Sequence, residues 1–276
     1  MPVYQAIILA IVQGVTEFLP VSSSAHLALA PWLFGWKDQG LAFDIALHLG
    51  TLLAVLIYFA RDWTQIFAQA FGINYRPDPE LRLNRTMLWL LALASIPIGV
   101  IGFLFKDEAE TTLRNPIIIG TMLIVVGIVM WYADKVGRRE RGVGSIGLID
   151  ALTIGCAQAL AVVPGTSRSG ATITAALFRG LDRQAAGRFS FLLSTPAVAA
   201  AGAKALYDLY KEGGIAPEMQ APFYAGIAAS AVTGCLVIGF FLRFLRANSL
   251  RFFIIYRILF GIVILILALA FRPHAV

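Results

Sequence analysis

Charged side chains are scarce in this sequence, where Asp, Glu, Lys and Arg together make up 14% of 276 residues. A soluble domain carries roughly 25%, so this chain has too little polar surface to cover a water-soluble particle. Hydrophobic residues make up 59% of it, and the mean hydropathy is +0.78. The composition therefore excludes a soluble globular protein and predicts one that is embedded in a lipid bilayer.

Cysteine and early positive charge are also lacking. Cys156 and Cys235 both lie in apolar runs, which indicates buried thiols and no disulfide framework. No Lys or Arg precedes Lys37, so residues 1–19 lack the basic start of a signal peptide and no removable leader is expected. The net charge of +6 comes from short connections between apolar runs, so nucleic-acid binding is not expected.

Long apolar runs dominate what is present. A helix needs about 20 predominantly apolar residues to cross a bilayer. We therefore expect an all-α polytopic membrane protein that forms one integral membrane domain over residues 1–276. Its six predicted transmembrane helices are residues 41–60, 86–105, 116–133, 189–209, 222–242 and 252–271.

Two further apolar segments are each interrupted by polar residues that begin at a proline. The first covers residues 3–34 with a break at 20–26, and the second covers 146–178 with a break at 164–170. The arm after each break has about eight residues, which reach only ~12 Å along a helix and cannot cross a core of ~30 Å. We therefore expect two re-entrant helix–loop–helix segments.

The distribution of Lys and Arg supports this topology. If both interrupted segments are re-entrant, the connections rich in these residues all fall on one side of the membrane. The positive-inside rule predicts that this side is cytoplasmic and that both termini lie outside. The basic connections are residues 61–85, 134–146, 179–188 and 243–251.

The same topology predicts an internal repeat. Residues 1–133 and 147–272 each contain one re-entrant segment and three spans, joined by the charged linker 134–147. Three spans is an odd number, so the second half must be inverted relative to the first. Pro20-x-Ser-Ser-Ser aligns with Pro164-x-Thr-Ser-Arg. Inverted repeats with discontinuous helices place their ligand sites near the midplane, where we expect the two breaks to meet.

The second break combines the features of an anion site. Its two glycines allow backbone conformations that other residues resist, and amides beside a helix N-terminus bind anions. Arg168 adds a fixed charge and a planar fork that suits phosphate oxygens, and a buried arginine in a membrane is costly and normally functional. The alternative is a structural loop whose arginine pairs with a nearby acid. The predicted phosphate contacts of this break are Gly165, Thr166, Ser167, Ser169 and Gly170.

The first break offers complementary chemistry. If Ser23 opens the short arm, Ser23 and His26 share one helical face, and a hydroxyl beside an imidazole is an activated nucleophile. Glu17, one turn before the break, would orient His26, act as a base or ligate a divalent cation. The alternative is that Glu17 pairs with Arg168 while the serines cap the short helix.

Other polar residues inside the apolar segments give weaker signals. Gln13 lies four residues before the acid on the same helical face. Asp44 and His48 are one turn apart in the first predicted span, Arg257 lies inside the last span, and Asp150 lies near the mouth of the second re-entrant segment. We expect structural or interfacial roles for these last four residues more than catalytic ones, with Gln13, His48 and Arg257 as candidate supports of the site.

At this point the residues resemble a known family. Gln13-Gly-Val-Thr-Glu17-Phe-Leu-Pro-Val-Ser-Ser-Ser-Ala-His26, together with Pro164-Gly-Thr-Ser-Arg-Ser-Gly170, resembles the undecaprenyl-pyrophosphate phosphatase family, also called the bacitracin-resistance proteins. The resemblance covers essentially the whole chain. The first motif follows a Glu/Gln-x-x-x-Glu pattern whose first position is glutamine here, so Glu17 is its only acid. Ser24 stands where relatives often have threonine.

The resemblance implies an enzyme that hydrolyses undecaprenyl diphosphate to undecaprenyl phosphate and inorganic phosphate. This reaction recycles the lipid carrier of peptidoglycan synthesis and confers bacitracin resistance. The implied location is the bacterial inner membrane, with the site open to the periplasmic side, and a homodimer is left open. A divalent cation, Mg²⁺ or Ca²⁺, is implied, with Glu17 as a candidate ligand.

The residues implied as catalytic are Glu17, Ser23, His26 and Arg168, with Ser22 and Ser24 among the phosphate contacts. We expect Arg168 to hold the terminal phosphate while Ser23 or a water attacks in line. His26, oriented by Glu17, would then take the proton. The alternative function is a transporter or flippase that carries a lipid phosphate through the same anion site; a structural membrane subunit would leave Arg168 unexplained.

Overall fold

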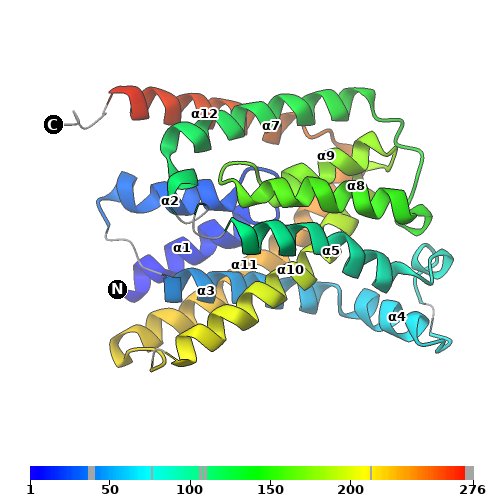
Figure 1. Cartoon of the computed structure of the whole chain (residues 1–276), viewed down its shortest axis with the longest axis horizontal. Coiled ribbons are helices and arrows are strands. Elements are labelled where there is room, and N and C mark those ends of the chain that lie inside the picture. Colours follow the sequence, from blue (N-terminus) through cyan, green and yellow to red (C-terminus); the bar gives the residue numbers. More distant parts are fainter. Residues whose placement is uncertain (37–40, 76, 106–107, 109–110, 212, 271–276) are drawn as a thin grey trace.

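The structure is a computed structural model that describes residues 1–36, 41–75, 77–105, 108, 111–211 and 213–270. Its helices run side by side along one long axis (Figure 1), which confirms the all-α membrane architecture. Five helices are long and apolar enough to cross a membrane, or up to six if one bent pair is counted as a span. The five are α5 (Met87–Leu104), α7 (Pro116–Val136), α10 (Arg183–Lys211), α11 (Pro217–Ala247) and α12 (Arg251–Ala270).

The first predicted span differs from expectation. It is α3 (Leu41–Tyr58), and at Phe59 the chain bends by 72° into α4 (Ala60–Ala70). The second stretch was expected to belong to a connection, because its polar residues interrupt the apolar run. In the structure α4 buries Trp63 and Ile66, so it is an amphipathic helix at the end of the bundle. The last predicted span extended to residue 271, which lies outside the described residues.

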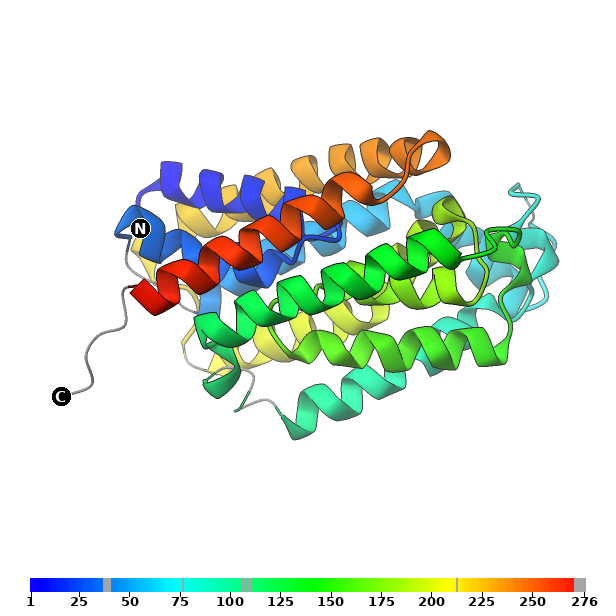
Figure 2. The same cartoon turned by 90° about the horizontal axis from the view of Figure 1, so that it is seen from above.

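The two interrupted segments form helical hairpins. The first pairs α1 (Val3–Thr16) with α2 (Ser23–Phe34), and the second pairs α8 (Leu148–Ala159) with α9 (Arg168–Phe178). Figures 1 and 2 show that the first hairpin opens toward the end that holds the N-terminus, whereas the second opens toward the opposite end. Their tips meet in the middle of the molecule, as the inverted topology predicts.

Each break begins a few residues before its proline and ends before the last residue predicted for it. α2 begins at Ser23 and α9 at Arg168, so two of the four catalytic candidates are the first residues of a helix. Immediately before these helices, Ser22 has a φ of 73° and Ser167 a φ of 70°. This left-handed conformation is uncommon outside glycine, and here it reverses the chain between the two arms of each hairpin.

A constant separation of 145 residues relates the two hairpins. It joins the left-handed residues Ser22 and Ser167 and the starts of α1 and α8. It also joins two hydroxyl pairs, since Ser22 Oγ lies 3.1 Å from Ser24 Oγ and Ser167 Oγ lies 3.2 Å from Ser169 Oγ. This separation is one residue longer than the one that aligns Pro20 with Pro164. We propose from these matches that the hairpins are equivalent elements of an inverted repeat.

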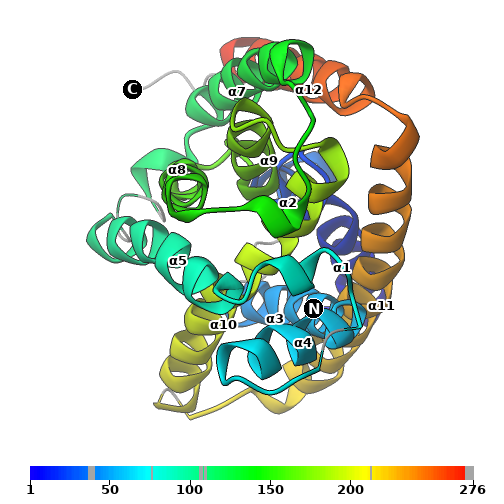
Figure 3. The ribbon, with the colours of Figure 1, turned by 90° about the vertical axis from the view of Figure 1, so that its right-hand side faces the viewer.

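The four basic connections gather at one end of the molecule, which faces the viewer in Figure 3. Salt bridges link one connection to another, so the clustering is built from specific pairs as well as from membrane topology. The pairs are Arg188 with Asp62 at 2.7 Å and with Asp78 at 3.1 Å, Arg183 with Asp134 at 2.6 Å, and Asp150 with Arg141 at 2.6 Å and with Arg179 at 2.7 Å.

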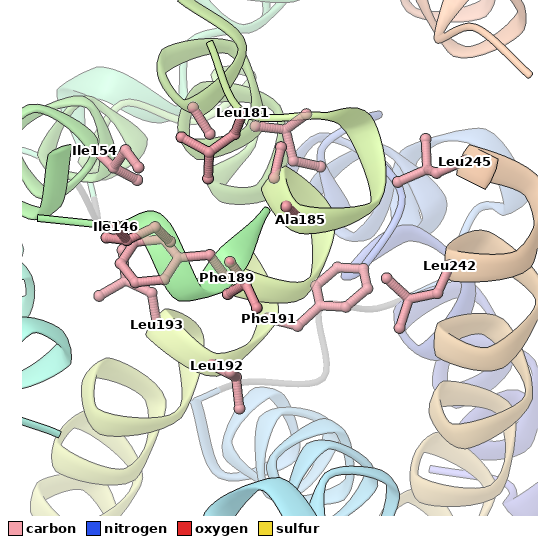
Figure 4. Packing of buried hydrophobic residues seen from close by; sticks show 14 of the residues in the cluster. Ile146, Ile154, Leu181, Ala185, Phe189, Phe191, Leu192, Leu193, Leu242 and Leu245 are labelled. Atoms are coloured by element: carbon pink, nitrogen blue, oxygen red, sulfur yellow. The ribbon is translucent and has the colours of Figure 1, made fainter. Parts of the chain in front are cut away.

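Helix α10 passes through the centre of the bundle and forms much of its core. Phe189, Phe191, Leu192 and Leu193 are all fully buried or nearly so, and Figure 4 shows them between side chains of the neighbouring helices. Elsewhere glycine allows helices to approach closely, because a Cβ at Gly155 would lie 2.4 Å from a backbone oxygen of α5. This packing holds α8 and α9 rigidly, and with them the second hairpin tip.

Asp150 anchors the mouth of the second hairpin. Its carboxylate accepts hydrogen bonds from Arg141, from Arg179 and from the backbone amide of Gly147 at the start of α8. Burial alone would raise the pKa of Asp150, but these hydrogen bonds outweigh it and lower the pKa to about 2, below the ordinary value of 3.8. The structural role expected for this residue fits these contacts.

We expect Asp150→Asn to lower the free energy of unfolding by about 1–2 kcal/mol at neutral pH, allowing for solvent around the half-exposed arginines. Because the folded-state pKa is depressed, the stabilisation is present above pH ~4 and is lost as the pH falls toward about 2. Thermal unfolding in detergent should therefore show a gap between wild type and variant that closes on acidification. A gap that stays constant from pH 7 to pH 2.5 would contradict this account.

Candidate active site

An ion pair joins the two hairpin tips. Arg168 Nη2 donates to Glu17 Oε1 at 2.7 Å, across 151 residues of sequence. The side chains are 14% and 7% exposed, so both charges are largely withdrawn from solvent. Arg168 Nη1 also donates to the carbonyl of Ser194 in α10 at 3.1 Å. The pairing of Glu17 with Arg168, one of the two alternatives left open by the sequence, is formed.

Ser23 lies directly on the same carboxylate. Its hydroxyl donates to Glu17 Oε2 at 2.5 Å, and Gln13 Nε2 donates to the same oxygen at 3.3 Å. Glu17 is thus contacted on one oxygen by a guanidinium and on the other by a hydroxyl. A hydroxyl that donates to an adjacent base is a common arrangement of an activated nucleophile. The supporting role of Gln13 stays a prediction, and its hydrogen bond to Glu17 is consistent with it.

His26 takes a different position from the one expected. Its Nδ1 lies 2.7 Å from the carbonyl oxygen of Ser22, and its Nε2 lies 2.7 Å from the hydroxyl of Tyr256 in α12. The ring also stacks on Tyr256 and on Phe260, with centroids 5.8 and 4.5 Å away. The prediction that Glu17 orients His26 was therefore wrong, because backbone and aromatic neighbours already hold both ring nitrogens.

The second tip presents backbone and hydroxyl groups around Arg168. Ser167 Oγ accepts from the amide of Gly170 at 3.1 Å and so caps α9. Ser169 Oγ donates to the carbonyl of Leu19 at 3.0 Å, a second link between the tips. Gly165 has a φ of 91°, and a Cβ there would lie 2.4 Å from the carbonyl oxygen of Ile119, so both space and backbone favour glycine.

Arg257 lies beneath both tips and binds neither Glu17 nor the open side of the site. It is completely buried, and its guanidinium donates only to backbone carbonyls within the described part of the chain. The acceptors are Pro20 at 3.1 Å in the first break, Gly165 at 3.0 Å and Thr166 at 2.9 Å in the second, and Leu123 at 2.9 Å in α7. The supporting role predicted for Arg257 is a clamp on the backbone.

The remaining predicted residues divide between the site and the scaffold. His48 lies close enough to Glu17 to interact with its charge, while its Nδ1 lies 2.8 Å from the carbonyl of Asp44 one turn earlier. Ser24 is exposed and Ser23 is half-buried, which marks this side of α2 as open. Thr166 is fully buried, and its hydroxyl has no hydrogen-bond partner among the described residues.

Two residues near the site were missed by the sequence analysis. Tyr256 holds His26, and the carbonyl of Ser194 holds Arg168. Tyr256 directly precedes Arg257 in an otherwise apolar span, which was the one signal that could have drawn attention to it. Ser194 precedes Pro196 inside α10, but nothing in the sequence shows that its carbonyl faces the second hairpin.

The side chains at the described tips do not by themselves form a binding site for a metal ion in the absence of substrate. No group of three His, Cys, Asp or Glu residues capable of holding a metal occurs in the described ranges. The one carboxylate at the tips already neutralises Arg168 and accepts two further hydrogen bonds. Mg²⁺ is usually held by one or two carboxylates together with substrate phosphates. The divalent cation therefore stays a prediction, and Glu17 is its sole candidate contact at the described tips.

The chemistry available at the tips is that of phosphoryl transfer. A guanidinium beside a helix N-terminus is chemistry that binds anions, and Arg168 lies in the first turn of α9. Ser23 and Glu17 place a hydroxyl and a carboxylate within hydrogen-bond distance of each other. Phosphoryl transfer depends mainly on positioning and on stabilising charge on the phosphate oxygens, and the two hairpins together carry groups of these kinds.

Comparison with known proteins agrees with this chemistry. The family described as "Bacitracin resistance protein BacA" matches residues 6–263. The chain is 48% identical to the undecaprenyl-diphosphatase of Gemmatimonas aurantiaca over 264 residues, which cover 96% of this chain and 97% of that protein. It is 45% identical over 271 residues to the undecaprenyl-diphosphatase of Pelotomaculum thermopropionicum, covering 98% of each chain. The identity to that of Thermomicrobium roseum is 48% over 277 aligned positions, covering 96% of this chain and 98% of the other.

Proposed function

Because this chain belongs to the family of the bacitracin resistance protein BacA, we propose that it is an undecaprenyl-diphosphatase whose reaction centre lies between the two hairpin tips. The enzyme releases inorganic phosphate from undecaprenyl diphosphate and leaves undecaprenyl phosphate, the carrier that peptidoglycan synthesis reuses. The observation that carries the assignment of the centre is the Glu17 carboxylate, bound by Arg168 on one oxygen and by Ser23 on the other.

Substrate binding exchanges the partner of Arg168. The terminal phosphate carries more negative charge than a carboxylate and offers several oxygens, so it competes with Glu17 for the guanidinium. As Arg168 turns to the phosphate, Glu17 is free to accept a proton from Ser23, which already donates to it. The ion pair thus balances the two charges in the empty site. When the substrate binds, Arg168 contacts the phosphate and Glu17 acts on Ser23.

The covalent route then runs as follows. Ser23 Oγ attacks the terminal phosphorus and passes its proton to Glu17, while the bond to the bridging oxygen breaks and undecaprenyl phosphate leaves. Water next attacks the phosphoserine, and inorganic phosphate is released. In the direct route, a water held by Ser23 and Glu17 attacks the terminal phosphorus instead. In both, Arg168 stabilises the charge on the phosphate oxygens. His26 is held at the same tip by Tyr256 and by the carbonyl of Ser22.

Ser23→Ala separates the two routes. We expect a loss of about 100-fold or more in kcat if Ser23 is the nucleophile, but a much smaller loss if water attacks. The measurement is phosphate release from undecaprenyl diphosphate by purified protein in detergent. Ser95→Ala is the matched control, because this serine lies in α5 and its hydroxyl bonds back to its own helix at 2.8 Å. Wild-type rates from Ser23→Ala would refute the assignment of this centre.

The family also suggests the cellular location and the orientation of the enzyme in the membrane. It is a multi-pass membrane protein, and we place it in the bacterial inner membrane with the basic end in the cytoplasm. The first hairpin then opens to the periplasmic side, where the diphosphate product of wall synthesis appears, and the polyprenyl tail lies in lipid between spans. The transporter alternative gains no support from the relatives, which are named as diphosphatases. A divalent cation and a homodimer stay predictions.

A further inference from the structure

Helix α12 brings two adjacent residues to the hairpin tips, although it belongs to neither hairpin. Arg257 clamps the backbone of both breaks, and Tyr256 reaches His26 in the first hairpin across 230 residues of sequence. Phe260, one turn further along α12, stacks on Tyr256 with ring centroids 5.8 Å apart. His26 therefore lies against two aromatic rings that its own hairpin does not supply.

Three neighbours hold the imidazole of His26. The carbonyl oxygen of Ser22 lies 2.7 Å from Nδ1, and the hydroxyl of Tyr256 lies 2.7 Å from Nε2. Phe260 covers one face of the ring with a centroid distance of 4.5 Å. Both ring nitrogens and one face are thus occupied, so the orientation of the imidazole is fixed.

The partners of the two nitrogens differ in what they can offer. A carbonyl oxygen only accepts hydrogen bonds, so the proton of neutral His26 lies on Nδ1 and points at Ser22. Nε2 then carries the lone pair and accepts from the hydroxyl of Tyr256. Because Nδ1 is committed to the backbone of the break, Nε2 is the nitrogen that is left to exchange a proton.

A tyrosine hydroxyl suits this nitrogen in both of its protonation states. It donates to Nε2 while the imidazole is neutral. Once Nε2 takes up a proton, the new N–H donates to the tyrosine oxygen, and the hydroxyl hydrogen turns away from the ring. A carbonyl or a backbone amide would serve only one of these states. Tyr256 therefore keeps the ring in place before and after a proton transfer.

We infer that Tyr256 is a positioning residue for the hydrolysis of undecaprenyl diphosphate. It keeps the proton of neutral His26 on Nδ1 and holds Nε2 at the first hairpin tip. The inference rests on the proposed function, which places the reaction at the tips, and on His26 as the predicted proton carrier there. Tyr256 is 40% exposed, but an aromatic residue that served only as an anchor at the membrane interface would not need its hydroxyl bound to an imidazole.

Nuclear magnetic resonance of the imidazole nitrogens tests the contact without relying on activity. The sequence has three histidines, so the full-length protein with isotope-labelled histidine gives few signals, and those lost in His26→Asn belong to His26. We expect a protonated Nδ1 and an unprotonated Nε2 in wild type. Tyr256→Phe keeps the ring and removes only the hydroxyl, so the Nε2 signal should shift toward that of an unbonded nitrogen. The matched control Tyr224→Phe removes a hydroxyl from an exposed tyrosine of α11 and should leave that signal unchanged.

Phosphate release from undecaprenyl diphosphate then measures what the position of His26 contributes to the reaction. We expect Tyr256→Phe to lower kcat by about 3- to 10-fold, the size of one hydrogen bond, with KM nearly unchanged. His26→Asn should lower kcat by about 100-fold or more. Because Tyr256 acts through His26, adding Tyr256→Phe to His26→Asn should cause no further loss.

The outcomes separate positioning from packing. A wild-type spectrum with the proton on Nε2, an unchanged Nε2 signal in Tyr256→Phe, or a further loss of kcat in the His26→Asn background overturns the inference. Phe260→Leu removes the stacked ring and keeps both hydrogen bonds, so an equally large Nε2 shift in that variant would assign the effect to packing and also overturn it. Wild-type rates from His26→Asn would overturn the positioning role and leave the centre formed by Glu17 and Arg168 standing, whereas the proposed function itself fails through Ser23→Ala.

Discussion

Replacing Arg168 with glutamine is expected to reduce phosphate release by about 1,000-fold or more. An arginine that stabilises the transferred phosphoryl group contributes roughly 10³–10⁵ in rate, and Arg168 is the sole arginine whose guanidinium reaches the Glu17 carboxylate in the described structure. The measurement is kcat for undecaprenyl diphosphate in detergent, beside a thermal unfolding curve of the same preparation. Arg168→Lys should recover little of the rate, because a lysine lacks the planar fork.

The neutral pair Glu17→Gln/Arg168→Gln gives the decisive control. Removing Arg168 alone leaves the Glu17 carboxylate buried without its counter-charge, which costs about 3–5 kcal/mol and could itself lower activity. The double variant keeps two uncharged side chains of similar shape and should recover most of that stability. If the ion pair were only structural, activity would return with stability. We expect the double variant to be stable and inactive, whereas an active one would refute the roles given to both Glu17 and Arg168.

Much of the fold could be predicted because it follows from hydrophobicity, length and charge. The arms after each break are too short to cross a bilayer, and the basic connections fall at one end, so two opposed hairpins were the consistent solution. The bend at Phe59 was not predictable in the same way. No proline or glycine marks it, and the turn follows from where α4 buries its apolar side against the bundle.

The residue types of the site could be predicted from the sequence, but the contacts between them could not. Interrupted helices that carry Arg168, Glu17 and Ser23 had to meet, because a buried charge in a membrane requires a partner. The sequence separation of Ser23 and His26 allowed them to face each other, yet it could not show that Tyr256 and the carbonyl of Ser22 take both imidazole nitrogens. Those partners lie on another helix and on the backbone, where sequence patterns carry no signal.

The second large expected effect is a loss of folding stability when the backbone clamp formed by Arg257 is removed. Its donors satisfy four buried carbonyls that belong to three separate segments, including both breaks. Each buried acceptor left without a partner costs about 1–3 kcal/mol. Arg257→Met keeps the unbranched stem of the side chain but removes the guanidinium with every donor, so we expect a loss of about 4 kcal/mol or more. The unfolding midpoint in detergent should fall by about 10 °C, and phosphate release should fall with it.

A nearby glycine supplies the independent check on this clamp. A Cβ at Gly170 would lie 2.7 Å from Arg257 Nη1, so Gly170→Ala should displace the guanidinium and reproduce part of the loss while every charge remains. Leu259→Met, on the exposed side of α12 two residues further on, is the matched control and should change neither midpoint nor rate. Because Arg257 fixes the breaks from below, the helices themselves should survive when it is removed. Unchanged unfolding of Arg257→Met would mean that the direct links between the tips, Arg168 with Glu17 and Ser169 with Leu19, hold them in place without the clamp.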